Sequence, residues 1–198
     1  MRRALTTALS LATLTFALAP QARADDVYWT TKALLKDFFK SSEKVSYVKV
    51  QGAALAEVEG KLGYHLPKGS YVVFVARSGE QVDGYAVMDD QMGQHQPISF
   101  GVKLDATGAV ERMEVMVYRE GYGDEVREGR FRKQFEGKGA DDHIRFGEDV
   151  VAISGATISS KAMAIGVRRA VALVAAARAN PPQPVASNAT GSGQRAAP

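Results

Sequence analysis

Apolar residues recur at helical spacing in three parts of the chain, and each part predicts a helix. The first part follows Thr30 and Thr31, either of which can cap a helix with its hydroxyl group. The second ends at Gly63, a residue type that commonly terminates helices. The third and longest covers residues 159–178 and is rich in alanine. The apolar positions of the first two helices are Leu34, Leu35, Phe38 and Phe39, and then Ala54, Leu55, Val58 and Leu62.

Between these helices, shorter runs either alternate between apolar and polar residues or are continuously apolar, as strands are. The last two runs flank the turn sequence Asp-Ala-Thr-Gly at residues 105–108, which predicts a β-hairpin. A helical turn is expected at residues 130–135, with Phe131 and Phe135 in the core. The predicted strands are residues 45–50, 71–75, 85–88, 98–104 and 110–118. Helices that bracket a mainly antiparallel sheet place the protein in the α+β class.

The first residues of the chain have the composition of a secretory leader. Arg2 and Arg3 precede an apolar stretch at residues 8–19, and the sequence Ala-Arg-Ala at residues 22–24 has the small residues of a cleavage site. This apolar stretch is shorter than the roughly 20 residues that a membrane span needs. We therefore expect residues 1–24 to be a cleaved signal peptide and the mature protein to be periplasmic or otherwise extracytoplasmic. An uncleaved membrane anchor is the alternative.

The last residues differ from the middle of the chain as well. Residues 179–198 contain four of the seven prolines and, apart from Val185, no large aliphatic or aromatic residue. Such a segment buries too little surface to offset the entropy lost on ordering, so it is predicted to be a disordered tail. Residues 25–178 remain as one domain, which is long enough to form a hydrophobic core.

The composition excludes several kinds of chemistry. The sequence has no cysteine, so disulfides, thiolate metal sites, iron–sulfur clusters and covalently attached c-type haem are excluded. His65, His95 and His143 stand singly, without neighbours at metal-ligand spacing, and we expect no metal site. Loss of residues 1–24 removes three of the 25 basic residues and no acidic one, which leaves 22 of each sign. A neutral chain without a basic stripe is not expected to bind nucleic acid.

Residues 153–160 read Ile-Ser-Gly-Ala-Thr-Ile-Ser-Ser and lie at the start of the longest predicted helix. The small side chains of Ser154, Gly155 and Ala156 let another group approach the backbone closely. The unpaired N–H groups and positive dipole end of a helix N-terminus favour a phosphate. The segment therefore suits a phosphorylated ligand. The alternative is an ordinary helix start with Thr157 or Ser160 as the N-cap.

The sequence Ser-Gly-Ala-Thr at residues 154–157 resembles the flavinylation motif of FMN-binding domains. These domains occur in subunits of the sodium-pumping NADH:quinone oxidoreductase, in the Rnf complex and in NosR-type proteins. In that family a flavin transferase esterifies FMN, through its phosphate, to the last threonine of the motif. The resemblance implies covalent FMN on Thr157 and contacts with FMN from the neighbouring residues Ser154, Gly155, Ala156, Ile158 and Ser159. The family usually has an aspartate six residues before the threonine, where this chain has Val151.

The resemblance extends to most of the domain. Residues 118–127 look like the family's acidic, glycine-containing loop, and residues 130–138 look like the segment R-F-x-x-Q-F-x-G-K that follows it. The resemblance implies flavin contacts for Glu120, Tyr122 and Gly123. Each residue also has a structural alternative: a solvated charge for Glu120, a core position for Tyr122 and a permissive backbone for Gly123.

The expected function is that of an extracytoplasmic electron carrier that holds FMN covalently. A flavin transferase would act on it during maturation, and membrane or soluble redox proteins would exchange electrons with it. Two alternatives remain open: a ligand-binding or interaction module without a redox role, and a flavoenzyme with noncovalent FMN. Apart from the loop around Glu120, no titratable group accompanies the motif, so an electron-transfer protein is favoured over an independent enzyme.

Removal of the leader can be tested on the secreted protein. We expect N-terminal sequencing to begin at Asp25, because Ala22 and Ala24 supply the small residues that a signal peptidase requires. Recovery of a membrane-bound chain that still begins at Met1 would contradict this prediction.

Overall fold

The computed structural model describes residues 25–180. The predicted signal peptide at residues 1–24 lies outside the described part, and so do residues 181–198 of the predicted tail. Both segments therefore stay predictions. Among residues 25–180, no helix combines the length and apolar character needed to cross a membrane.

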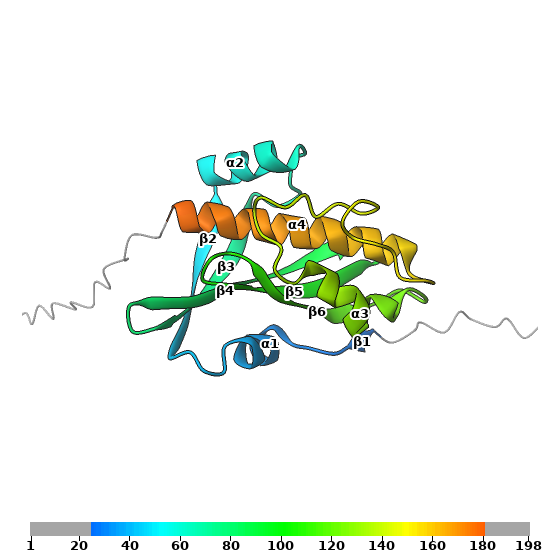
Figure 1. The fold of residues 1–198 in the computed structure, drawn as a ribbon, viewed down its shortest axis with the longest axis horizontal. Coiled ribbons are helices and arrows are strands. Elements are labelled where there is room, and N and C mark those ends of the chain that lie inside the picture. Colours follow the sequence, from blue (N-terminus) through cyan, green and yellow to red (C-terminus); the bar gives the residue numbers. More distant parts are fainter. Residues whose placement is uncertain (1–24, 181–198) are drawn as a thin grey trace, which may run out of the picture.

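Six strands form one sheet in the order β1-β6-β5-β4-β3-β2 (Figure 1). Every pairing in the sheet is antiparallel, which confirms the predicted α+β class. The predicted hairpin is β5-β6, where Asp105 Oδ1 accepts hydrogen bonds from the N–H groups of Thr107 and Ala109 at 2.8 and 3.0 Å. The strands are β1 Asp26–Val27, β2 Lys44–Gln51, β3 Ser70–Ser78, β4 Gln81–Met92, β5 Pro97–Asp105 and β6 Val110–Tyr118.

The helices begin and end close to the positions that the sequence predicts. Thr30 caps the first helix, since its Oγ1 accepts a hydrogen bond from the N–H group of Ala33 at 3.2 Å. Gly63 ends the second helix in the left-handed conformation, with φ of 82°. The helices are α1 Thr31–Phe38, α2 Ala53–Leu62, α3 Gly129–Arg132 and α4 Thr157–Ala179, with 3-10 turns η1 Asp124–Arg127 and η2 Lys133–Phe135. The longest helix, α4, thus begins two residues before the predicted start at Ser159.

The sheet separates two apolar layers. Helices α2 and α4 lie on one face, where they bury the larger core, and α1 lies on the other face with a smaller core (Figure 1). Phe131 and Phe135 are buried in the larger core, which confirms their predicted positions. Met88 packs against the smaller core beneath α1. The sheet therefore lies between α4 and α1.

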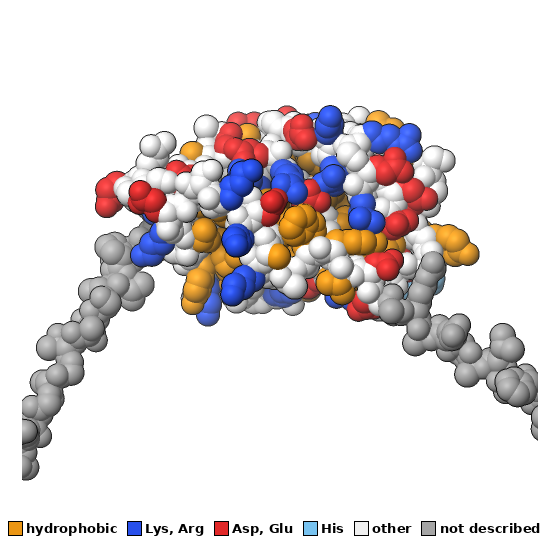
Figure 2. All heavy atoms as spheres, turned by 90° about the horizontal axis from the view of Figure 1, so that it is seen from below, with side chains coloured by type: hydrophobic (Ala, Val, Ile, Leu, Met, Phe, Trp, Pro, Cys, Tyr) orange, Lys and Arg blue, Asp and Glu red, His pale blue; other side chains and the backbone are white. Residues whose placement is uncertain are grey.

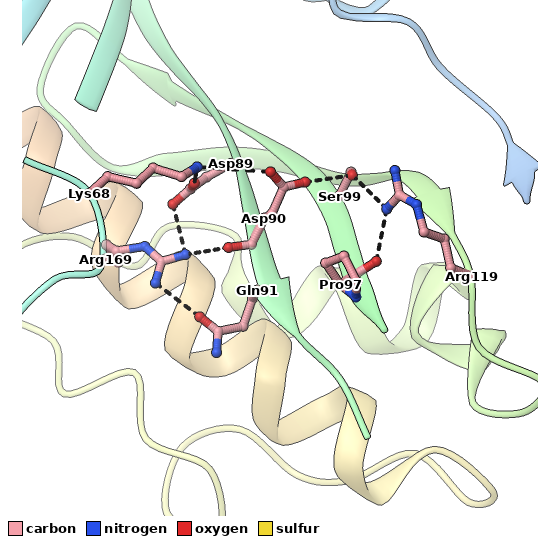
Figure 3. A network of polar contacts seen from close by, with 8 residues as sticks. All are labelled: Lys68, Asp89, Asp90, Gln91, Pro97, Ser99, Arg119 and Arg169. Carbon is pink, nitrogen blue, oxygen red and sulfur yellow. Dashed lines mark hydrogen bonds and ion pairs between the residues drawn. The ribbon is translucent and has the colours of Figure 1, made fainter. Parts of the chain in front are cut away.

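A buried ion pair joins α4 to the sheet. Strand β4 continues to Met92, four residues beyond the predicted strand at 85–88, and this extension carries Asp89. Both Asp89 and Arg169 of α4 are buried, and Asp89 lies 2.7 Å from the guanidinium of Arg169 and 2.6 Å from the ammonium of Lys68 (Figure 3). Arg169 also donates hydrogen bonds to the side chain of Gln91 and the backbone of β4. No local pattern predicts this strand extension, because its polar residues are buried through partners far along the chain.

The ion pair can be tested by removing one charge. We expect Asp89→Asn to lower the free energy of unfolding by about 3 kcal/mol, since it leaves Arg169 buried without a counter-charge. The neighbouring carboxylate of Asp90 is half exposed, so Asp90→Asn should change it by less than about 1 kcal/mol. Urea denaturation measures both variants. Equal losses in the two would show that the buried pair does not stabilise the fold.

Candidate functional site

The motif at residues 154–157 leads directly into α4. Thr157 is the first residue of the helix and Ala156 is the N-cap, so no side chain caps this end. The alternative that Thr157 or Ser160 is the N-cap is therefore wrong. Ser160 is buried and turns back along the chain, with its Oγ accepting a hydrogen bond from the N–H group of Ile153 at 3.2 Å. The N-terminus of α4 consequently has backbone N–H groups that no capping side chain engages.

Gly155 holds the motif in a conformation that other residues rarely adopt. Its φ is +85°, and a Cβ atom at this position would lie 2.8 Å from Oε1 of Glu125. The other carboxylate oxygen of Glu125 is buried and has no hydrogen-bond partner. A side chain at Gly155 would therefore be strained and would also collide with Glu125. The expected close approach to the motif backbone is real, and in this structure the approaching group is the Glu125 carboxylate.

A second glycine brings the loop after β6 against the start of α4. Gly123 has φ of +95°, and a Cβ atom there would lie 2.6 Å from Ser159 Oγ and 2.7 Å from the Tyr118 hydroxyl. The Tyr118 hydroxyl donates to the carbonyl oxygen of Tyr122 at 2.5 Å and lies 2.8 Å from Ser159 Oγ. Burial raises the pKa of Tyr118, so its hydroxyl stays protonated as a donor. Tyr118 and Ser159 thus join the loop after β6 to the start of α4. The family resemblance did not indicate this contact.

Glu120 and Tyr122 lie in the same loop but have different surroundings. Oε1 of Glu120 accepts hydrogen bonds from the N–H groups of His95 and Gln96 at 2.6 and 3.0 Å. Burial raises the pKa of Glu120, but these backbone hydrogen bonds outweigh it and hold the pKa below its usual value. Glu120 therefore fixes the turn between β4 and β5 rather than standing as a free solvated charge. Tyr122 is 90% exposed, so the alternative that it packs in the core is wrong.

The hydroxyl groups of the motif differ in accessibility. Ser154 and Thr157 are exposed, as is Ile158, whereas Ser159 and Ser160 are buried. The hydroxyls of both buried serines already contact protein atoms, Tyr118 in one case and the backbone of residue 153 in the other. Among the described residues at the start of α4, Thr157 therefore has the one exposed hydroxyl, since Ser154 precedes the helix.

Gln134 supports the residues before the motif, and sequence reasoning did not single it out. Its side chain accepts from the N–H group of Val151 at 2.8 Å and donates to the carbonyl oxygen of Val151 at 3.1 Å. The Val151 side chain is 65% exposed. Asp149 does not take the place of the usual motif aspartate, because its carboxylate accepts from the N–H groups of Ile144 and Arg145. The only indication of its role in the sequence was its place as the glutamine of the R-F-x-x-Q-F-x-G-K segment.

A cavity of about 200 Å³ lies beside this segment, between α3 and the residues that precede the motif. Its walls include Arg130, Gln134, Val151 and Ser154. Larger cavities of about 280 to 380 Å³ lie elsewhere, including one beside α2 and the loop at residues 139–145 and one at the start of α1. The small cavity is the one that adjoins the motif, so size alone does not identify the site.

Comparison with known proteins finds a similarity over part of the chain. Residues 93–172 match the sequence profile of the FMN-binding domain family. The matched region runs from the turn held by Glu120 through the loop after β6 to the greater part of α4. It therefore contains both halves of the candidate site. No curated protein shows a significant match to the chain.

The contact between the loop and α4 yields a stability prediction. We expect Tyr118→Phe to lower the free energy of unfolding by about 1 to 3 kcal/mol, because the Tyr122 carbonyl loses its donor and the buried Ser159 hydroxyl loses a partner. Tyr122→Phe is the matched control and should change stability by less than about 0.5 kcal/mol, since Tyr122 is 90% exposed. Thermal or urea unfolding compares the two. A Tyr118→Phe variant as stable as the control would show that the contact is dispensable.

Proposed function

We propose that the protein is an electron carrier with FMN esterified to Thr157, since residues 93–172 match the FMN-binding domain family. The observation that carries the proposal is the exposed Thr157 hydroxyl at the uncapped start of α4, within the matched region. A phosphate attached there would lie at the positive end of a long helix, where backbone N–H groups and the helix dipole stabilise negative charge.

The residues around Thr157 fit a flavin nucleotide. Gly155 has no side chain to obstruct the backbone, and the buried oxygen of Glu125 that lacks a partner can accept a hydrogen bond from a sugar-alcohol hydroxyl of the ligand. Tyr122 exposes its ring in the loop that adjoins the motif, where it is available to stack on a planar ring system. FMN would supply one- and two-electron redox chemistry, while these residues bind and orient it.

The location and partners follow from the same proposal. The leader at residues 1–24 favours an extracytoplasmic protein, which a flavin transferase modifies during maturation. A covalent tether has a physical advantage outside the cytoplasm, because a lost cofactor would not be replaced there. Membrane or soluble redox proteins would donate and accept the electrons. We favour a carrier over an independent flavoenzyme, since the titratable groups that the described residues place beside the motif, Glu125 and Tyr118, both belong to strand β6 and the loop that follows it.

The tether can be tested by intact mass of the denatured protein, produced in a host that has the flavin transferase. We expect the wild-type chain to carry the added mass of FMN less one water, and Thr157→Val to lack it, because valine has no hydroxyl to esterify. Ser154→Ala is the matched control: it removes the other exposed hydroxyl of the motif and should keep the added mass.

Two outcomes would contradict the proposal. If the wild-type protein has the unmodified mass but remains yellow until it is denatured, FMN is bound noncovalently. If Thr157→Val keeps the added mass and Ser154→Ala loses it, the flavin is attached to Ser154 and not to Thr157.

A further inference from the structure

The face of the sheet that carries α1 presents a row of lysines. Lys32, Lys36 and Lys40 follow one another at four-residue intervals along α1 and just beyond its end, and all three are exposed. None of them forms an ion pair with a described residue. Figure 2 shows this face, on which Lys and Arg side chains lie beside exposed hydrophobic side chains, with Asp and Glu side chains among them.

Three acidic residues near this row are already engaged by an arginine or by another lysine, and a fourth, Glu43, accepts a hydrogen bond from the N–H group of Gly79. Asp37, the acidic residue of α1, lies 2.7 Å from the guanidinium of Arg112. Arg112 also pairs with Glu114 at 2.7 Å. On the same strand, Glu111 pairs with Lys103 at 2.5 Å. The charges of the lysine row are therefore free to act on a partner outside the molecule.

Exposed apolar and aromatic side chains lie on the same face, on the edge strand β2. Tyr47 is 62% exposed and Val45 is 39% exposed, with Lys49 next on that side of the strand. Tyr47 stands opposite Phe74 of β3, and Phe74 packs against the small core beneath α1. The tyrosine, the valine and the lysines thus lie on the same side of the sheet.

We propose that this face, defined by Lys32, Lys36, Lys40, Lys49 and Tyr47, binds the surface of a membrane that contains anionic phospholipids. Unpaired lysines attract anionic headgroups, and tyrosine is well suited to the boundary between headgroups and acyl chains. Phospholipid is the occupant that matches both features, because a layer of headgroups offers negative charge over a wide area with apolar material directly below it. The sheet lies between this face and α4, so the end with the flavin motif stays open to a redox partner (Figure 1).

The test is co-sedimentation of the mature chain with vesicles. We expect binding to vesicles of phosphatidylglycerol mixed with phosphatidylcholine, none to phosphatidylcholine alone, and weaker binding as salt is raised. The double variant Lys32→Gln with Lys36→Gln should bind about 25-fold more weakly, at about fivefold for each lysine. Tyr47→Ser should also weaken binding, because it removes the exposed aromatic ring that would enter the boundary between headgroups and acyl chains. No flavin is needed, so the outcome does not depend on the tether at Thr157.

The matched control removes two charges from the opposite side of the sheet. Lys61 in α2 and Lys161 in α4 are exposed and form no ion pair with a described residue, so Lys61→Gln with Lys161→Gln changes the net charge equally. This variant should retain most of the vesicle binding. An equal loss in both double variants would overturn the proposal, since binding would then depend on net charge alone. Failure of the wild-type chain to bind the anionic vesicles would overturn it too.

Discussion

The ion pair between Asp89 and Arg169 fixes the position of α4, and the candidate site depends on that position. Both residues are buried, so the pair acts where water does not screen it. One turn before Arg169, Gly166 lies so close to Phe100 that a Cβ atom there would be 2.6 Å from the ring. Because a helix rises 1.5 Å per residue, Thr157 stands about 18 Å along the axis from Arg169. A rigid helix anchored at its middle therefore places the motif at the end of the sheet.

The N-terminus of α4 is held by a different kind of contact. Two glycines in the left-handed conformation, Gly123 and Gly155, allow the loop after β6 and the motif to meet. The contact is made by Tyr118 against Ser159 on one side and by Glu125 against Gly155 on the other. In the proposed site, this rigid backbone would hold the cofactor, and FMN itself would supply the chemistry. The match to the FMN-binding domain family covers both segments, as this arrangement requires.

The sequence was sufficient to predict those features of the fold that depend on neighbouring residues in the chain. The cap at Thr30 and the end of α2 at Gly63 are each set by residues within one turn, and both were predicted. The strand that carries Asp89 was predicted too short, because its polar residues are buried by partners on α4. Ser159 looked like part of a helix start, yet its hydroxyl is committed to Tyr118, which precedes it by 41 residues. Such pairings require the tertiary structure.

The central claim is that Thr157 carries the flavin, and peptide mapping tests it most directly. Trypsin should release residues 146–161 as one peptide, which contains Ser154, Thr157, Ser159 and Ser160. Ser159 and Ser160 are buried, and Ser154 and Thr157 are exposed. Tandem mass spectrometry of the flavin peptide should place FMN on Thr157. Fragment ions that place it on a serine, or the absence of any flavin peptide from protein made with the transferase, would contradict the account.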